Sequence, residues 1–387
     1  MSEAGFAGRR VALVHPSWHS CGTYRVVLGQ IEAYRAMGAE VFPIAVSSDP
    51  GFVPGRDWIW KSFAQATPEL DAGLRPYLHG DQAAIRLGMA ARAKLPRELA
   101  ARDYDLVHCN HFFLMPVARR LARGRAPILL DTHDLQARQF ELFNARMPWL
   151  SPRVAYEQML AQELEAMRGA DLLLHLNAQE AEDFRALLPE KRHALLYPPT
   201  PSAPMGPGGA DIVIVSSNNT ANVESVIWFL REIAPKAPGV AVKIAGNVDA
   251  GVRAGAPELY EAHKGRFLGR VDDPGAVYAG AKLVLLPTIS GTGLSIKTVE
   301  AMSSGLPIIA TPQALRGMDA EAFQLPGVSV VETADDFAGA LTVSAADSPP
   351  RESDRSASPA RAYYESRFSL PAYRRSLATL AKPLLGL

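Results

Sequence analysis

Short apolar segments alternate with helical segments twice along this chain, once on each side of a Pro- and Gly-rich stretch. The apolar segments of the first half are 10–14, 40–46, 106–108, 127–131 and 171–176, and those of the second half are 211–215, 240–245, 265–268, 283–287 and 306–311. Short buried strands separated by helices are typical of parallel sheets that carry helices on both faces. The alternation therefore predicts an α/β protein with two doubly wound parallel sheets, each binding ligands at the carboxyl ends of its strands.

The Pro- and Gly-rich stretch at residues 198–209 sets the predicted domain boundary. It contains five prolines and three glycines, which exclude a regular helix or strand. We expect an N-terminal domain over 1–197, a linker over 198–209, a second domain over 210–369 and a C-terminal helix over 370–387 that crosses back to the first domain. Two domains agree with the length of 387 residues, which is too long for one ordinary core. The Ser-, Ala- and Pro-rich segment 344–361 predicts a surface loop.

The composition excludes several classes of protein. Lys plus Arg and Asp plus Glu each total 40, so the chain lacks the basic excess of a general nucleic-acid binder. The sequence has neither a run of eighteen apolar residues nor the features of a signal peptide. Its two cysteines cannot form a disulfide framework or a four-thiolate zinc site. These features predict a cytoplasmic protein.

One segment of the second half, residues 285–312, has the features of a nucleotide site. The turn Gly291-Thr-Gly293 precedes a short helix, and the N–H groups and dipole at a helix N-terminus favour an anion. Lys297 adds a positive charge inside this helix, and Glu300 carries a carboxylate that can accept hydrogen bonds from two ribose hydroxyls. The same pattern is also compatible with an ordinary βα corner whose glycines only turn the chain.

The sequence resembles the GT-B glycosyltransferases, specifically the retaining family-four type, over nearly the whole chain. The family pattern of a Glu, seven residues, a second Glu and Ala-Met-x-x-Gly-x-Pro corresponds to residues 292–307, and further matching segments are 216–224, 242–246 and 267–273. The resemblance implies the GT-B fold, in which two Rossmann-like domains face a central cleft. It also implies a nucleotide-sugar-dependent glycosyltransferase similar to those of bacterial polysaccharide and cell-surface glycan synthesis.

The resemblance assigns the donor site to the second domain. In the family, the Gly-rich turn faces the diphosphate of the sugar nucleotide and the second Glu holds the ribose. The residues that this assigns to the donor are Ser217, Asn218, Asn219, Gly246, Arg270, Val271, Gly291, Thr292, Gly293, Leu294, Ser295, Lys297 and Glu300. Glu300 is also assigned to the catalytic centre.

The chain departs from the family pattern at two places. Thr292 stands where the family has its first Glu, so the contact of that Glu with the donor sugar is lost or altered. Residues 217–219 stand where an Arg and a Lys often neutralise the diphosphate, and neutral amides cannot balance its charge. Lys297 and Arg270 are the candidates to replace that charge. A second hypothesis therefore stays open, a catalytically inactive homologue that binds a nucleotide sugar or acts as an assembly partner.

Histidines lie in or beside three strand ends of the first half. They are His15, His19, His108, His111 and His133, and parallel strands would bring them to one edge of the sheet. His133 resembles the family's histidine near the donor sugar, which makes it the predicted catalytic residue, with a role in positioning and polar stabilisation. A histidine that caps a turn is the alternative. No spacing among these histidines matches a standard metal-ligand pattern, so we predict no metal and a metal-independent reaction.

The acceptor side is predicted at the start of the first helix. In the family this turn is Gly-rich so that the acceptor can approach, which assigns acceptor contacts to Gly22, Thr23, Tyr24 and Arg25, together with His19 and His111. Helix capping by Thr23 is the alternative. Retaining enzymes of the family are described as reacting on one face of the sugar, with the departing phosphate accepting the proton of the acceptor.

The first half also carries a cluster of basic residues. Nine Lys and Arg residues against three acidic residues lie between 85 and 125, a pattern that fits either a surface resting on anionic lipid or a solvated helical face. We therefore expect transfer from a UDP-, GDP- or dTDP-type sugar to a glycan or lipid-linked glycan, with retention and without a cofactor. The predicted location is the cytoplasm, with peripheral contact at the inner face of the membrane and no nucleic-acid partner.

Overall fold

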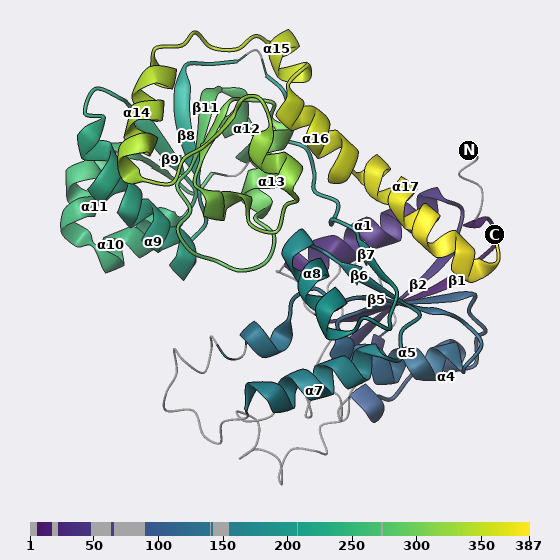
Figure 1. The fold of residues 1–387 in the computed structure, drawn as a ribbon. Coiled ribbons are helices and arrows are strands. Elements are labelled where there is room, and N and C mark those ends of the chain that lie inside the picture. Colours follow the sequence, from purple (N-terminus) through teal and green to yellow (C-terminus); the bar gives the residue numbers. More distant parts are fainter. Residues whose placement is uncertain are drawn as a thin grey trace. The chain divides into compact units, whose positions relative to one another are not determined.

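The computed structural model describes residues 6–17, 22–47, 63–65, 90–139, 141, 155–206, 208–271 and 274–387. The chain divides into two compact units, the first formed by Met1–Pro199 with Tyr373–Leu387 and the second by Thr200–Ala372 (Figure 1). Each unit is built around its own parallel sheet.

The first unit contains a sheet of seven parallel strands in the order β3-β2-β1-β4-β5-β6-β7. The strands are β1 (Arg10–Pro16), β2 (Glu40–Ser47), β3 (Phe63–Gln65), β4 (Leu106–Asn110), β5 (Ile128–Asp131), β6 (Leu172–His175) and β7 (His193–Leu195). The chain starts at the centre, winds outward to β3, and returns to β4 on the other side of β1. This reversal between β1 and β4 is the switch point, where ligands bind in such sheets.

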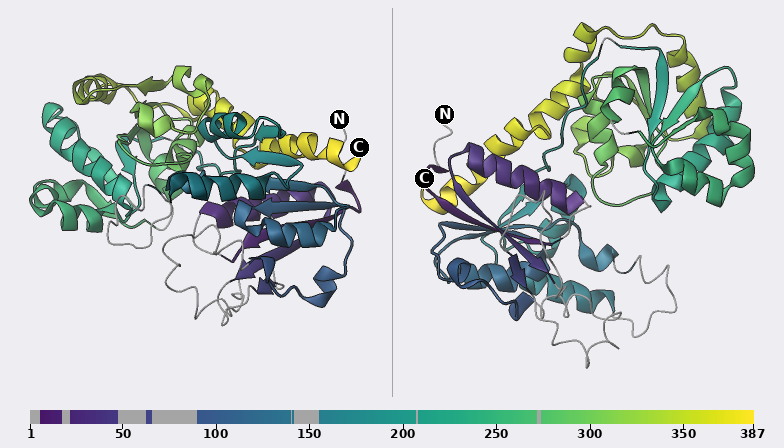
Figure 2. Two further views of the ribbon diagram at one scale, coloured as in Figure 1. Left: turned by 60° about the horizontal axis from the view of Figure 1, so that its bottom comes forward. Right: turned by 180° about the vertical axis from the view of Figure 1, so that it is seen from behind.

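Helices cover both faces of the first sheet (Figure 2). They are α1 (Gly22–Ala36), α4 (Arg97–Ala100), the 3₁₀ turn η4 (Phe112–Leu114), α5 (Met115–Ala122), α7 (Tyr156–Met167) and α8 (Ala178–Leu187). Successive strand residues point to opposite faces, so Ala12 and Val14 join the large core under α5 and α7, whereas Leu13 packs with Val27 and Ile31 of α1.

The second unit contains six parallel strands in the order β10-β9-β8-β11-β12-β13. They are β8 (Asp211–Val215), β9 (Val242–Ala245), β10 (Phe267–Gly269), β11 (Ala281–Leu286), β12 (Ile308–Ala310) and β13 (Val328–Val330). The order repeats the arrangement of the first unit, with its switch point between β8 and β11. Two Rossmann-like, doubly wound units of this kind confirm the predicted fold class.

Helices on both faces complete the second unit (Figures 1 and 2). One face packs against α9 (Thr220–Trp228), the π-helical turn η5 (Phe229–Ile233), α10 (Val248–Gly255) and α14 (Ala334–Ala345). Further helices are α11 (Pro257–His263), α12 (Pro274–Ala279), α13 (Ile296–Ser303), α15 (Glu352–Ser356), α16 (Pro359–Arg367) and α17 (Leu370–Ala381), and short 3₁₀ turns are η6 (Ala234–Lys236), η7 (Lys264–Arg266), η8 (Pro312–Leu315), η9 (Ala320–Gln324) and η10 (Lys382–Leu385).

The structure differs from the sequence prediction in segment 344–361, which is largely helical instead of a surface loop. The residues Ala345, Glu352–Ser356 and Pro359–Arg367 belong to α14, α15 and α16. Arg355 is completely buried, and its guanidinium donates to the carbonyl oxygens of Ser304 at 3.0 Å, Gly206 at 3.3 Å and Tyr278 at 3.4 Å. Buried polar groups need such partners, and here one arginine donates to three backbone carbonyl oxygens from separate segments of the chain.

Most of the segment expected as a linker belongs to the second unit, and most of the C-terminal helix belongs to the first. Residues from Thr200 onward belong to the second unit, where the Ala203 N–H donates to Ser303 Oγ at 2.8 Å. Tyr373–Leu387, most of α17 and all of η10, belong to the first unit. In both figures α17 lies alongside α1. Among the described residues, we find no helix with the length and apolar character that crossing a membrane requires.

Candidate functional site

The loops at the carboxyl ends of β8 and β11 form the predicted donor site of the second unit. Ser216 follows β8 and is buried, and its N–H donates to the carbonyl oxygen of Ala245 at 2.8 Å. Ser217 accepts two hydrogen bonds from Asn222 Nδ2, at its carbonyl oxygen (2.8 Å) and at Oγ (2.9 Å). The side chains of residues 217–219 are exposed at the switch point.

The two asparagines of this loop have local structural roles. The Asn218 N–H donates to Asn247 Oδ1 at 2.8 Å, which ties the loop after β8 to the loop after β9. Asn219 is the N-cap of α9, since its Oδ1 accepts the N–H of Asn222 at 3.0 Å. The N-terminus of α9 therefore lies in this loop, and the remaining N–H groups and the dipole of the helix favour an anion there.

The Gly-rich turn after β11 packs directly on an arginine. Gly291 has a φ of 130°, and a Cβ placed there would lie 3.0 Å from the guanidinium carbon of Arg316. Arg316 donates from Nε to the carbonyl oxygen of Thr292 at 3.2 Å, and Gln313 Nε2 donates to that of Gly291 at 2.8 Å. The positive φ favours glycine at this position, and the absence of a side chain lets the Arg316 guanidinium approach the turn.

Lys297 lies on α13 and reaches the loop after β8. Its Nζ donates to Asn222 Oδ1 and is 3.5 Å from Ser216 Oγ. Burial and the charge of Arg316, opposed by the charge of Glu300, together lower the pKa of Lys297 to about 8. Burial also lowers the pKa of Arg316. Two partly buried cations, one of which lowers the pKa of the other, form a site that an anion would stabilise.

Glu300 and Lys297 share one face of α13. Both lie within the helix, which begins at Ile296. They are three positions apart, so they are neighbours on its surface. Glu300 is half-buried and raises the pKa of Lys297, which places its carboxylate close to the ammonium. Ser295, the buried N-cap, accepts a hydrogen bond from Thr298 Oγ1 at 2.9 Å, while Leu294 and Gly293 precede it in the turn.

Two glycines shape the neighbouring loops. Gly246 has a φ of 107°, and its N–H donates to the carbonyl oxygen of Gly269 at 2.8 Å. A Cβ at Gly246 would lie 2.0 Å from the carbonyl oxygen of Ser216, so only glycine fits between these loops. Arg270 and Val271 follow Gly269, with Arg270 exposed and Val271 half-buried.

In the first unit, three of the predicted residues come together at the carboxyl ends of the central strands. The rings of His111 and His133 stack with centroids 3.9 Å apart and an interplanar angle of 12°. Thr23 Oγ1 lies 3.1 Å from His111 Nε2, so the first turn of α1 joins the pair. Both histidines have positive φ, 69° and 60°, a backbone strain that concentrates at functional sites.

His133 is buried and neutral at physiological pH. Burial and His108, opposed by the carboxylate of Asp131, together lower its pKa to about 4. Its Nε2 lies 2.9 Å from Asn110 Oδ1. An uncharged imidazole of this kind can exchange hydrogen bonds with a sugar but cannot balance a phosphate charge.

Two buried glutamates hold the turn that follows His133. Glu163 of α7 accepts the N–H groups of Gln136 and Ala137, both at 3.0 Å, and Glu180 of α8 accepts that of Leu135 at 3.2 Å. Burial, opposed by these backbone bonds and increased by Asp134, raises the pKa of Glu163 to about 7. Burial together with Asp134 raises that of Glu180 to about 8. The backbone after His133 is therefore fixed from two helices.

The other predicted acceptor residues are spread over the start of α1. Gly22 and Arg25 are exposed, and Tyr24 packs against the small core of Leu13, Val27, Ile31 and Ala45. His19 lies outside the described residues. His15 is buried, with its Nδ1 2.9 Å from the carbonyl oxygen of Pro16, and burial lowers its pKa to about 4.

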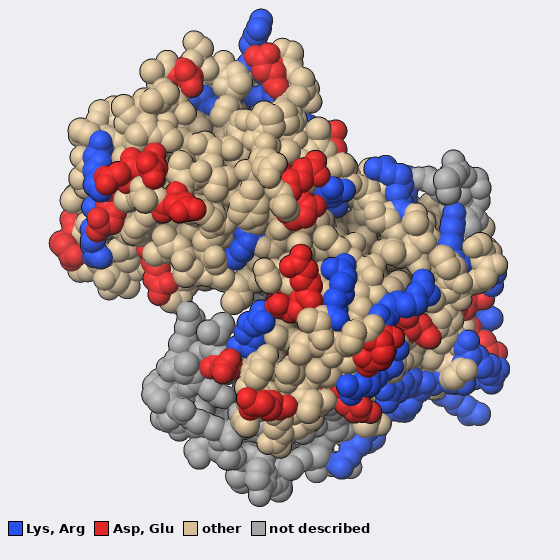
Figure 3. Space-filling model, viewed as in Figure 1, with Lys and Arg blue, Asp and Glu red and all other residues tan. Residues whose placement is uncertain are grey.

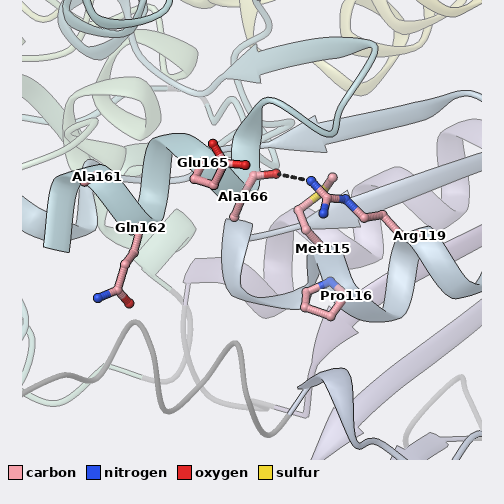
Figure 4. A pocket seen from close by; sticks show the side chains of 7 residues that line it. All are labelled: Met115, Pro116, Arg119, Ala161, Gln162, Glu165 and Ala166. Atoms are coloured by element: carbon pink, nitrogen blue, oxygen red, sulfur yellow. Dashed lines mark hydrogen bonds between the residues drawn. The ribbon is translucent and has the colours of Figure 1, made fainter. Parts of the chain in front are cut away.

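A cavity of about 460 Å³ lies between α5 and α7, away from these residues (Figure 4). Met115, Pro116 and Ala161 line it, and Arg119 at one side donates to the carbonyl oxygen of Ala166 at 3.5 Å. It contains no predicted site residue. Among the described residues, no group of three or more His, Cys, Asp or Glu side chains is arranged to hold a metal ion.

Sequence reasoning missed two residues that the structure brings into these sites. Arg316 follows β12, and it reaches the Gly-rich turn because β12 lies next to β11 in the sheet. Asn110 ends β4 and contacts His133 at the end of the adjacent β5. Each of these residues is polar and lies at or after the end of a strand. In each case that strand pairs with the strand that precedes a predicted site residue.

The fold and the two loop sites define a glycosyltransferase of the GT-B type. The profile of the family "Glycosyl transferases group 1" matches residues 209–347, and that of the "Glycosyl transferase 4-like domain" matches residues 22–200. Together they span both units, and the chain belongs to the group 1 glycosyltransferases.

Individual relatives agree with this family. Phosphatidyl-myo-inositol mannosyltransferase of Mycobacterium tuberculosis is 25% identical over 302 residues, which cover 75% of this chain and 74% of that protein. The crystal structure of Anabaena HepE with UDP has a TM-score of 0.61 at 14% identity and covers 97% of this chain and 100% of that one. The α,α-trehalose 6-phosphate synthase of Burkholderia multivorans has a TM-score of 0.58 at 14% identity, covering 98% and 99%. These two structures share the fold.

Proposed function

We propose that this glycosyltransferase moves a sugar from a nucleoside-diphosphate sugar to a glycan or lipid-linked glycan, with retention and without a metal ion. The observation that carries the proposal is the pair of cations under the Gly-rich turn, Lys297 on α13 and Arg316 after β12. Their partial burial and mutual repulsion favour binding of a diphosphate, whose negative charge develops further as the sugar departs.

The two cations also supply positive charge in place of the Arg and Lys that the family often has at the positions of residues 217–219. The neutral side chains there cannot balance a diphosphate, but Lys297 donates to the same loop and carries the charge that the loop lacks. Arg316 contacts the turn at the carbonyl oxygen of Thr292 and adds a planar guanidinium whose donors match phosphate oxygens. Arg270, the other candidate from the sequence, is exposed and follows β10, which is separated from β8 by β9.

Glu300 completes the proposed donor site. On the same face of α13 as Lys297, its carboxylate is suited to accept hydrogen bonds from two ribose hydroxyls. The names of the solved relatives support this class of donor, since HepE is described in complex with UDP and with UDP-glucose. The mannosyltransferase relative supports an acceptor of lipid-linked type for this chain.

His133 contributes to the sugar-transfer step as a neutral hydrogen-bonding group in this proposal. With its pKa lowered to about 4, the neutral ring is a weak base, so this proposal assigns the proton of the acceptor hydroxyl to the departing phosphate. Thr23, which contacts His111, and His111, which stacks on the His133 ring, are the proposed acceptor side of the same unit.

The test is a thermal-shift panel of uridine, guanosine, thymidine and adenosine diphosphates and their sugars with wild type and Glu300→Ala. A nucleotide at a hundredfold its dissociation constant stabilises a protein by about 2.7 kcal/mol. We expect one base series to stabilise wild type and to lose most of that effect in Glu300→Ala.

Glu261→Ala is the matched control, because Glu261 is an exposed glutamate of the same unit whose side chain pairs with Lys264 on the surface. It should respond to nucleotide as wild type does. Equal stabilisation of Glu300→Ala and wild type would contradict the ribose assignment. Transfer of a labelled sugar, with the anomeric configuration of the product read by NMR, then tests retention.

A further inference from the structure

The interior of the first unit contains a chain of buried polar side chains that ends at His133. The chain runs from Asp131 at the end of β5, through Gln30 on α1, to Asn110 at the end of β4, and then to the His133 ring. Asp131, Gln30 and Asn110 are all completely buried. Burying three polar side chains in a core costs stability unless they are fully paired, so a network of this kind calls for an explanation.

The carboxylate of Asp131 fixes the orientation of Gln30. A carboxylate only accepts hydrogen bonds, so the group of Gln30 that contacts Asp131 Oδ2 is the amide nitrogen Nε2. The carbonyl oxygen Oε1 of Gln30 therefore points to Asn110, where it accepts from Nδ2 at 2.9 Å. Within the described part of the chain, the buried Asp131 Oδ1 has no hydrogen-bond partner, which lowers the stability of the fold. The contact of Oδ2 with Gln30 is the structural role of this carboxylate.

Gln30 in turn fixes the orientation of Asn110. Because Asn110 Nδ2 donates to Gln30 Oε1 and lies 3.4 Å from the carbonyl oxygen of Val14, its Oδ1 faces the opposite way. That oxygen accepts the second N–H of Gln30 Nε2 at 3.2 Å and lies 2.9 Å from His133 Nε2. An amide oxygen can only accept, so His133 must carry its proton on Nε2 and its lone pair on Nδ1.

His108 closes the network on the other side of Asp131. Its Nε2 lies 3.4 Å from Asp131 Oδ2, and its Nδ1 lies 3.0 Å from the hydroxyl of Tyr34. A proton on Nε2 satisfies both contacts, because it faces the carboxylate and leaves Nδ1 to accept the tyrosine O–H. These bonds keep the Asp131 carboxylate in place beneath the strand ends.

We propose that Asp131, Gln30 and Asn110 are positioning residues that set the tautomer of His133, so that its Nδ1 presents a hydrogen-bond acceptor to the substrate. The proposal rests on the proposed function for the role of His133 in sugar transfer, but the tautomer itself follows from the hydrogen bonds. Burial keeps the ring neutral, with its pKa lowered to about 4, so one nitrogen must hold the proton and the other the lone pair.

Nitrogen NMR of the full-length protein, labelled with ¹⁵N in its histidine rings, reads the tautomer directly. The His133 signals are assigned as those lost in His133→Gln. At about pH 7 we expect a protonated Nε2 and an unprotonated Nδ1 in wild type. A proton on Nδ1 would overturn the proposal.

Asp131→Asn tests the origin of the orientation, because a side-chain amide can donate as well as accept and no longer fixes Gln30. We expect His133 to show both tautomers or the Nδ1–H form. Adding Asn110→Asp should restore the Nε2–H form, since a carboxylate next to His133 accepts whatever the orientation of Gln30. The double variant also keeps one buried carboxylate in the network. An unchanged tautomer in Asp131→Asn, or no restoration in the double variant, contradicts the relay.

Asp171→Asn is the matched control, because Asp171 Oδ2 accepts the N–H of Ile128 at the opposite end of β5 at 2.7 Å. Its His133 signals should match wild type. If circular dichroism shows that Asp131→Asn does not fold, Gln30→Met cuts the relay without changing charge, and should also give a second tautomer. Retention of the single Nε2–H form in a folded Gln30→Met variant opposes the proposal.

Kinetics separate this inference from the proposed function. With the donor identified by the nucleotide panel, Asp131→Asn should lower kcat about 2–10-fold, the effect of losing one neutral hydrogen bond made in the transition state, with KM for the donor unchanged. Asn110→Asp should recover part of kcat in the double variant. If no donor supports transfer by wild type but the NMR results hold, the proposed function fails and the relay stands. If Asp131→Asn leaves the His133 tautomer unchanged but wild type transfers sugar normally, the relay fails and the proposed function stands.

Discussion

Lys297 is the residue whose ionisation should decide how donor binding depends on pH. Its pKa is about 8 in the folded protein, lowered first by burial, so it loses its charge as the pH rises through that value. Loss of a hydrogen bond to a charged partner costs about 1.5–3 kcal/mol, or roughly 10–100-fold in affinity. Nucleotide affinity measured by calorimetry should therefore be constant below about pH 7 and fall above about pH 8.

Lys297→Met should bind nucleotide at about pH 7 as weakly as wild type does at high pH, and without a pH dependence in this range. Lys243→Met, which removes an exposed lysine paired with Asp211 at 2.8 Å, should behave as wild type. Unfolding does not explain the loss of affinity at high pH. The lowered pKa means that charged Lys297 destabilises the fold, so losing this charge as the pH rises does not weaken the fold. An affinity that is flat through about pH 9 in wild type would show that Lys297 does not contact the diphosphate.

The sequence identified Lys297 and Glu300 but not Arg316. The first two share a helix with the glycine turn, so a local motif was enough to predict them. Arg316 lies 24 positions after Thr292, and its contact with that residue depends on β12 pairing with β11. Strand order in a parallel sheet is not written in a local pattern, so a residue that reaches the site from the next strand could not be assigned.

At the scale of elements, the junction of the loops after β8 and β9 depends on one glycine. Gly246→Ala should destabilise the second unit by more than about 1 kcal/mol, because φ is 107° and the new Cβ would lie 2.0 Å from the carbonyl oxygen of Ser216. It should also weaken nucleotide binding, since Ser216 begins the loop that Lys297 contacts. Thermal unfolding and nucleotide titration measure the two effects.

Gly339→Ala provides a control of opposite sign. Gly339 lies in the interior of α14 and is exposed, and among the described residues no atom lies within 4 Å of the position that a Cβ would take there. Alanine there should stabilise the protein by about 0.4–1 kcal/mol through the unfolded chain and the helix propensity. Equal effects of the two substitutions would mean that the Gly246 junction is not as tight as its geometry requires.

Elements with a strong local signal were predicted, and elements without one were not. The central strands are continuous apolar runs, and the sequence placed them in both halves. Three of the four edge strands, β3, β7 and β13, have three residues each and were missed, whereas the equally short edge strand β10 was predicted at residues 265–268. The helices α15 and α16 were missed because Ser and Pro favour a loop. The buried Arg355 holds α15 through contacts with Ser304 and Gly206, which are distant in the chain.

At the scale of the whole molecule, the net charge is zero but the charges are unevenly distributed. Eight basic residues and three acidic residues lie between positions 90 and 125, and Figure 3 shows the basic side chains gathered over α4 and α5. Several of them are engaged: Arg123 and Arg125 approach Asp103 at 3.3 and 3.7 Å, and Arg120 donates to the carbonyl oxygen of Ala93 at 2.6 Å. Engaged side chains still contribute to the positive field of this surface.

This surface predicts binding to anionic vesicles, which is the membrane contact expected for a lipid-linked acceptor. Each basic residue near an anionic bilayer contributes about 1 kcal/mol, so replacing the exposed Arg92, Lys94 and Arg97 by Gln should weaken binding by about 3 kcal/mol, roughly a hundredfold. Sedimentation with phosphatidylserine-containing vesicles measures the change, and added salt should weaken wild-type binding because it screens exposed charges. Replacing Lys236, Lys243 and Lys264 of the second unit by Gln changes the net charge by the same amount. If that control lost as much binding as the first triple variant, net charge would govern the interaction, and the surface over α4 and α5 would not be a membrane contact.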